Sequence, residues 1–155
     1  SDNPIVAECT SLLPNTNVAV DGIAIKPGKT TTAVFIGGKP VFVFPSNPTA
    51  ALIMYQLFAR TLVQRLAGRP TAGLRALSAV VGSKMFSAKG SRTFQPVQLS
   101  FDEKCRLIAD LVEAQGAVSG LANVDGFVEI AENESVLEEN QEVAVWLLRG
   151  IATKA

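Results

Sequence analysis

The pattern that most constrains the fold is one long helical signal in the first half of the chain, with only strand-sized apolar runs after it. Asn47 suits a helix N-cap, Pro48 suits the first helical position, and Gly68 suits the position just past the C-cap. Between these ends, apolar side chains recur every three or four residues and form one stripe: Leu52, Tyr55, Ala59, Leu62 and Leu66. We therefore predict a helix from Asn47 to about Gly68, with this stripe as its apolar face.

After the predicted helix, the pattern of apolar residues in the sequence changes. Gly68, Arg69 and Pro70 break the helical pattern, and from about Leu74 short strand-like runs alternate with turns rich in Gly, Ser, Asn and Glu. The runs cover residues 74–81, 93–100, 126–130 and 142–148. Short strands at this spacing indicate a small barrel or sandwich, and we place a boundary between two units near Pro70.

The residues before the helix predict a short helix and three strands. Asn3 suits the N-cap of the short helix and Pro4 its first position. Its candidate apolar contacts are Val6, Leu12 and Leu13. Runs rich in β-branched and aromatic residues follow at 18–20, 31–36 and 41–44. Gly37 and Gly38, between the last two runs, are typical of a tight hairpin turn.

The composition excludes several classes of site and partner. The chain has 14 basic and 14 acidic residues, which gives no electrostatic reason to expect nucleic acid or an anionic membrane as a partner. It has no histidine, so a Ser-His-Asp or Cys-His site cannot be built from this chain alone. No apolar run reaches the roughly 18 to 20 residues of a membrane-spanning helix, and the first residues lack the features of a signal peptide. We therefore expect a cytoplasmic protein, with Cys9 and Cys105 as reduced thiols rather than a disulfide.

Two segments carry a resemblance to a known family. The first, residues 21–52, contains Lys-Pro-Gly-Lys (the KPGK segment, residues 26–29) and, after a strand, Pro-Ser-Asn-Pro (the PSNP loop, residues 45–48). The second, residues 118–130, contains Ser119 and an Asp-Gly pair before a strand, and residues 140–148 fit a closing strand. In this order and spacing the segments resemble the molybdopterin molybdotransferases of the MoeA type, a family that includes the E domain of gephyrin.

The resemblance implies a fold of class α/β plus all-β. Residues 1–72 would be the C-terminal portion of a MogA-like α/β domain that binds substrate. Residues 73–155 would be a small β-barrel domain that follows it.

Residues 102–114 carry two opposed signals. Ser100 and Glu103 have the spacing of a capping box, and the apolar residues after them have helical spacing, so the residues alone predict a helix. The family instead has a hairpin here. On the resemblance, we predict a turn at 102–104 and a strand over 105–113, because tertiary pairing can override local propensity.

The KPGK segment supplies the candidate catalytic residues, Lys26 and Lys29. Their two ammonium groups lie three residues apart, on a turn made by Pro27 and Gly28. Such a pair can converge on a phosphate or another oxyanion and stabilise charge that develops at phosphorus. The alternative is that both are solvated lysines beside a turn.

The PSNP loop precedes the N-terminus of the predicted helix, where free N–H groups and the helix dipole attract anions. The residues assigned to substrate binding are Pro27, Gly28, Pro45, Ser46, Asn47, Pro48 and Ser119, and no metal ligand is assigned. Two alternatives stay open. Asn47 only caps its helix, or Ser119 only belongs to a turn that leads into a strand.

The family's reaction hydrolyses adenylated molybdopterin while molybdate enters its dithiolene, with Mg²⁺ as the expected cofactor. The resemblance also implies a homodimer, or a companion chain that supplies the missing half. The family's Thr-Gly-Asp and Ser-Gly-Gly segments, which build a phosphate cradle and an acidic metal site, do not occur in this sequence. Ser46 also replaces a glycine of the family's loop. We therefore expect the chain alone to be inactive. The alternatives are a non-catalytic binding or scaffold module, as in gephyrin, and a non-functional fragment.

Overall fold

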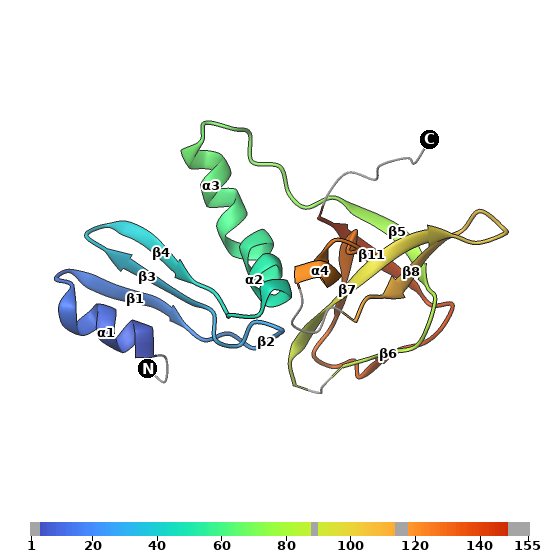
Figure 1. Ribbon diagram of the computed structural model, residues 1–155, viewed down its shortest axis with the longest axis horizontal. Helices are drawn as coiled ribbons and strands as arrows, with labels where there is room; N and C mark the ends of the chain where they lie inside the picture. The colour runs from blue at the N-terminus through green and yellow to red at the C-terminus, as the bar shows by residue number, and fades with distance from the viewer. Residues whose placement is uncertain (1–3, 88–89, 114–117, 149–155) are drawn as a thin grey trace.

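The structure is a computed structural model that describes residues 4–87, 90–113 and 118–148. Figure 1 shows a small sheet with a helix beside it, a long helix in the middle, and a β-rich unit on the far side. The small sheet contains the antiparallel strands β1 (Thr16–Asp21), β3 (Thr32–Ile36) and β4 (Lys39–Val43), in the order β1-β3-β4. These strands confirm the three runs predicted before the helix.

A two-residue turn joins β3 to β4. Ile36 pairs with Lys39, and the two glycines between them, Gly37 and Gly38, have φ angles of 55° and 79°. Consecutive positive φ angles suit glycine and match the twist of a hairpin. The predicted tight turn is confirmed.

The first helix, α1, covers Pro4–Leu12 and contacts β1. The predicted helix is confirmed, but two of its predicted apolar contacts are wrong. Leu12 is 69% exposed and Leu13 is 42% exposed, because no element in the described part of the chain covers the last turn. Asn3 and the side chain of Val6 lie outside the described residues.

The long helix is continuous from Pro48 to Leu66 and has three parts: α2 (Pro48–Met54), a π-helical turn η1 (Tyr55–Ala59) and α3 (Arg60–Leu66). Asn47 caps it, since its Oδ1 accepts the Ala50 N–H at 3.0 Å. At the other end Gly68 has a φ of 65°, and the N–H groups of Gly68 and Arg69 bond back to the last turn. Both predicted ends of the helix are confirmed.

The predicted apolar stripe of this helix is wrong in detail. Leu66 is 77% exposed, and Leu52, Tyr55 and Leu62 are only half-buried. The residues that the helix buries are Thr49, Ala50, Ile53, Met54 and Ala59. The π-helical turn widens the helix at 55–59, so a face drawn at regular spacing does not continue through it. In Figure 1, α3 also projects away from the β-rich unit.

The β-rich unit is a closed five-stranded barrel. Its strands follow the order β7-β8-β5-β11-β9, and β9 pairs with β7 to close it. The β5–β8 pair is parallel and the other pairs are antiparallel. The strands are β5 (Ala76–Val81), β7 (Arg92–Phe101), β8 (Leu107–Leu111), β9 (Gly126–Ile130) and β11 (Glu142–Leu147). The predicted small barrel is confirmed, and the four predicted runs correspond to β5, β7, β9 and β11.

A hairpin joins β7 to β8. The predicted strand is confirmed at Leu107–Leu111, whereas the turn predicted at 102–104 extends to Arg106. Asp102 organises the turn: its Oδ1 accepts the N–H groups of Lys104 and Arg106 at 2.9 and 2.8 Å. Its Oδ2 also accepts Arg106 Nε–H at 2.8 Å. The helix that the residues alone predicted is wrong because β8 pairs with a strand on each side, β7 and β5. Cys105 in this turn is an exposed free thiol, and the side chain of Cys9 lies outside the described residues.

Several short elements have no counterpart in the sequence predictions, among them two strands and a helix. Strand β6 (Met85–Phe86) pairs with β10 (Val136–Leu137), and α4 (Val118–Leu121) packs against α2. Each is too short to carry a periodic pattern. They form because segments far apart in sequence meet.

The first part of the chain contacts the barrel in two ways, through a short strand and through an apolar cluster on the long helix. Strand β2 (Ile25–Lys26), within the KPGK region, pairs in parallel with the start of β7. The apolar cluster brings Ile53 and Met54 of α2 against Phe94 and Phe127 of the barrel. Residues before the predicted boundary at 72 therefore add a strand to the sheet of the barrel.

Candidate functional site

The KPGK segment forms a turn that packs directly on the long helix. The Lys26–Pro27 peptide bond is cis, and Gly28 is buried with a φ of 140°. A Cβ on Gly28 would lie 2.5 Å from the Sδ of Met54, so this position has no room for a side chain. The turn is closed by two backbone hydrogen bonds, from Thr31 N–H to the Gly28 carbonyl and from Ile23 N–H to the Lys29 carbonyl. Glycine is thus required here for both its conformation and its size.

The PSNP loop connects β4 to the N-terminus of α2. Ser46 and Asn47 are exposed, whereas Pro45 and Pro48 are half-buried. Asn47 caps the helix as expected, and it also lines a pocket. Capping therefore does not keep this residue away from a ligand.

The structure brings the KPGK segment, the PSNP loop and the barrel to one open pocket, which we call the KPGK pocket. Its volume is about 360 Å³, within the range of roughly 300 to 1,000 Å³ typical of small-molecule sites. The KPGK segment supplies Pro27, and the PSNP loop and α2 supply Asn47 and Thr49. The barrel supplies the other described lining residues: Phe94, Gln95, Pro96, Leu111, Val112 and Glu113. These barrel residues were not predicted, because no local pattern shows which strand residues face a distant turn.

Lys26 and Lys29 lie on either side of Pro27 and Gly28 in sequence and are both exposed, but neither is among the described residues that line the pocket. Within the described part of the chain, neither lysine forms a salt bridge. Three cations of the barrel unit do form salt bridges: Arg92 with Glu129 at 3.1 Å, Lys84 with Glu138 at 2.9 Å and Arg106 with Asp102 at 2.8 Å. The positive charge of the KPGK segment thus has no carboxylate partner among the described residues.

Ser119 lies on α4, which packs against α2. The segment that carries Ser119 therefore reaches the same helix as the PSNP loop. The side chain of Ser119 lies outside the described residues, and its assignment to substrate binding stays a prediction.

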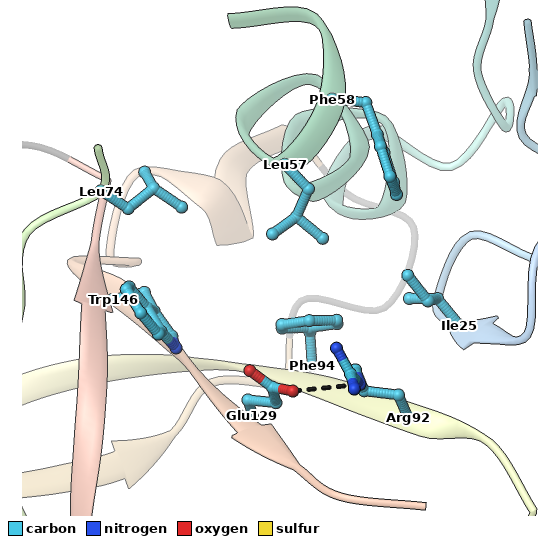
Figure 2. Close-up of a pocket in the computed structure, with 8 residues that line it drawn as sticks. All are labelled: Ile25, Leu57, Phe58, Leu74, Arg92, Phe94, Glu129 and Trp146. Carbon is cyan, nitrogen blue, oxygen red and sulfur yellow. Dashed lines mark ion pairs between the residues drawn. The ribbon is translucent and has the colours of Figure 1, made fainter. Parts of the chain in front are cut away.

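A second pocket, the helix–barrel pocket, lies between the long helix and the barrel (Figure 2). It has a volume of about 220 Å³, and its apolar lining is Ile25, Leu57, Phe58, Leu74, Phe94 and Trp146. The Arg92–Glu129 ion pair lies along one edge, as Figure 2 shows. Trp146 is half-buried and lines this pocket. No sequence motif predicts the pocket, because its lining comes from several separate elements.

Two further observations concern metal binding and membrane-spanning helices. No three His, Cys, Asp or Glu side chains in the described part of the chain gather closely enough to hold a metal ion. Over the same residues, no helix is both long and apolar enough to cross a bilayer.

Comparison with known proteins identifies the family. Residues 78–148 match the family described as the MoeA C-terminal region (domain IV). The fold superposes on a molybdopterin biosynthesis MoeA protein of Pyrococcus horikoshii with a TM-score of 0.77 and 37% sequence identity, over 94% of this chain. This chain corresponds to the C-terminal part of the proteins of the MoeA family.

Two sequence relatives agree with this MoeA assignment. The chain is 28% identical over 135 residues to a molybdopterin biosynthesis protein of Methanocaldococcus jannaschii, which covers 86% of the chain. It is 25% identical over 124 residues to molybdopterin molybdenumtransferase 2 of Mycobacterium tuberculosis, which covers 80% of the chain. The chain spans 30% of the length of each relative and 34% of the Pyrococcus horikoshii structure.

The MoeA match also shows which site residues it reaches. The matched range, 78–148, includes the barrel wall of the KPGK pocket and Ser119. The KPGK segment and the PSNP loop lie before it, and their role rests on the motifs and on the pocket.

Proposed function

We propose that this chain takes part in molybdenum cofactor biosynthesis as the C-terminal part of a molybdopterin molybdotransferase, with the KPGK pocket as its substrate site. The observation that carries the proposal is that Pro27 of the KPGK segment and Asn47 of the PSNP loop line the same pocket. Each of these two motifs therefore contributes a residue to the pocket. Lys26 and Lys29 of the KPGK segment form no salt bridge in the described part of the chain.

In this proposal, Lys26 and Lys29 bind the phosphates of adenylated molybdopterin. Ammonium groups neutralise the ground-state charge of the phosphates and stabilise the charge that develops at phosphorus as the adenylate leaves. The positive end of the long helix dipole, beside Asn47, adds to the positive potential. Molybdate, the second substrate, is an oxyanion and is attracted by the same field.

The Mg²⁺ expected from the family needs more oxygen ligands than the described residues place here. A hard cation binds through several oxygens at once, and Glu113 is the one carboxylate among the described residues that line the KPGK pocket.

Three further proposals follow from the resemblance. Residues 1–72 belong to a MogA-like α/β domain, and the site is completed in a homodimer or by a companion chain. The protein acts in the cytoplasm. Analytical ultracentrifugation of the purified chain tests the dimer, since a chain that sediments as a monomer at micromolar concentration contradicts it.

Binding measurements with matched lysine variants test the proposed site. We expect pyrophosphate and adenylated molybdopterin to bind the parent chain. Lys26→Ala and Lys29→Ala should each weaken binding roughly ten- to hundredfold, because each removes a charge-assisted hydrogen bond. Lys39→Ala is the control, since Lys39 is also an exposed lysine but follows the β3–β4 turn. Unchanged binding in both KPGK variants, or an equal loss in Lys39→Ala, would sink the assignment.

A second candidate function is a non-catalytic binding module, favoured by the helix–barrel pocket. Apolar side chains dominate this pocket, and Phe58 on its rim is 41% exposed. Trp146 is the only tryptophan of the chain, so energy transfer from it reports a bound probe such as 1-anilinonaphthalene-8-sulfonate. We expect Phe58→Ala to reduce this transfer and Phe101→Ala, at an exposed barrel phenylalanine, to leave it unchanged. Equal signals from both variants count against the module.

A further inference from the structure

The barrel forms a complete wall of the KPGK pocket. Phe94, Gln95 and Pro96 of β7 line it, together with Leu111, Val112 and Glu113 at the end of β8. The two parts of the wall are tied together, because the Val112 N–H donates to the Pro96 carbonyl at 2.9 Å. The pocket therefore has one side at the KPGK segment, where the proposed function places the phosphates, and a separate side made by the barrel.

Glu113 is the one ionisable residue among the described residues that line this pocket. It is exposed, so its carboxylate is open to a ligand. Gln95, the other long polar side chain of the wall, is already engaged: its Nε2 donates to the Phe86 carbonyl at 3.0 Å. The chemistry of the barrel wall thus depends on a single carboxylate among apolar neighbours.

An ionised carboxylate only accepts hydrogen bonds, through two oxygens side by side. Its best partner is a flat group with two adjacent N–H donors on one edge. A pterin has this edge, since its 2-amino group lies next to a ring N–H. Adenine does not, because its 6-amino group lies between ring nitrogens that only accept. Pro27, Phe94 and Pro96 make the lining around the carboxylate apolar, as is usual in pockets that bind ring compounds.

We propose that Glu113 determines which end of the substrate enters the barrel side of the pocket, by binding the aminopyrimidinone edge of the pterin. This inference rests on the proposed function, in which the phosphates are bound at Lys26 and Lys29. The substrate then lies with its pterin against the barrel and its phosphates against the KPGK segment. The adenosine points out of the pocket.

Fragment probes separate the two sides of the site. Pterin fluorescence anisotropy measures the binding of 6-hydroxymethylpterin, and calorimetry measures pyrophosphate and adenosine monophosphate. We expect Glu113→Gln to weaken pterin binding roughly tenfold or more, because the amide loses one of the two acceptors and the charge. Pyrophosphate affinity should be unchanged. Glu103→Gln is the matched control, an exposed glutamate in the β7–β8 turn.

A change in the ligand gives an independent test. The lumazine analogue carries a carbonyl oxygen in place of the 2-amino group, so it should bind the parent at least tenfold more weakly than the pterin. The inference is overturned if Glu113→Gln binds the pterin as the parent does. It is also overturned if the lumazine binds equally well, or if the parent binds adenosine monophosphate through this pocket and no pterin. None of those results contradicts the proposed phosphate site. The proposed function is contradicted instead if Lys26→Ala and Lys29→Ala both bind pyrophosphate as tightly as the parent does.

Discussion

At the scale of single residues, Gly28 shows how closely the candidate site depends on local packing. It is the residue at which the KPGK segment touches the long helix, through Met54. Its φ of 140° is accessible to glycine and strained for any other residue. The positions of Lys26 and Lys29, on either side, are therefore set by a contact that a single methyl group would break.

We predict that Gly28→Ala lowers the free energy of unfolding by about 1 to 3 kcal/mol, since the new Cβ meets Met54 and the backbone is strained. Urea denaturation followed by circular dichroism measures this. Gly73→Ala is the control, because a Cβ on Gly73 meets nothing within 4 Å. Equal stabilities for the two variants contradict the packing described for the KPGK segment.

At the scale of elements, the sequence predicted those whose signal is local. The caps of the long helix, the turn at Gly37 and Gly38 and the four barrel runs were all found from residues close in sequence. Strand β8 was found only through the family resemblance, because its own residues have helical spacing. Pairing with β7 and β5 decides its structure. The apolar face of the long helix was misjudged because nothing in the sequence marked the π-helical turn at Tyr55–Ala59.

The β7–β8 turn gives a prediction about pH. The backbone N–H of Arg106, followed by its side chain and the N–H of Lys104, lowers the pKa of Asp102 below its usual value of 3.8. A lowered pKa in the folded state adds stability above the unfolded-state pKa, and this stability is lost as the pH falls through the folded-state value. Asp102→Asn should therefore be less stable than the parent at pH 7, and the difference should shrink below about pH 4.

Chemical denaturation of both proteins between pH 2 and pH 7 measures that difference. Glu103→Gln, one residue further along the same turn, is the control and should show no such trend. A gap between Asp102→Asn and the parent that stays constant over this range contradicts the role given to Asp102.

At the scale of the whole molecule, the candidate site lies where the long helix, the KPGK segment and the barrel meet. The two motifs on one side of the pocket could be found in the sequence, because each is a continuous run of residues. The barrel wall could not, since Phe94 and Glu113 enter the site only through strand pairing. The helix–barrel pocket could not be predicted from the sequence either, because no motif marks its lining residues.

The whole molecule also gives a prediction about activity. We expect the 155-residue chain alone to show no molybdate insertion, because the family's acidic metal-binding segments do not occur in its sequence. Incubation with adenylated molybdopterin, molybdate and Mg²⁺, followed by assay of the molybdenum cofactor, measures this. Turnover by the purified chain would contradict the expectation.

In the proposed site, the KPGK segment and the helix N-terminus beside the PSNP loop together bind one anion. The most direct test is a titration of the ¹⁵N-labelled chain with pyrophosphate, followed by amide chemical shifts. We predict that the largest shifts cluster on Gly28 and Lys29 of the KPGK segment and on Asn47 and Thr49 at the start of the helix, with one common affinity. Shifts centred on other exposed lysines, such as Lys39, or different affinities for the KPGK and helix amides, would contradict the claim.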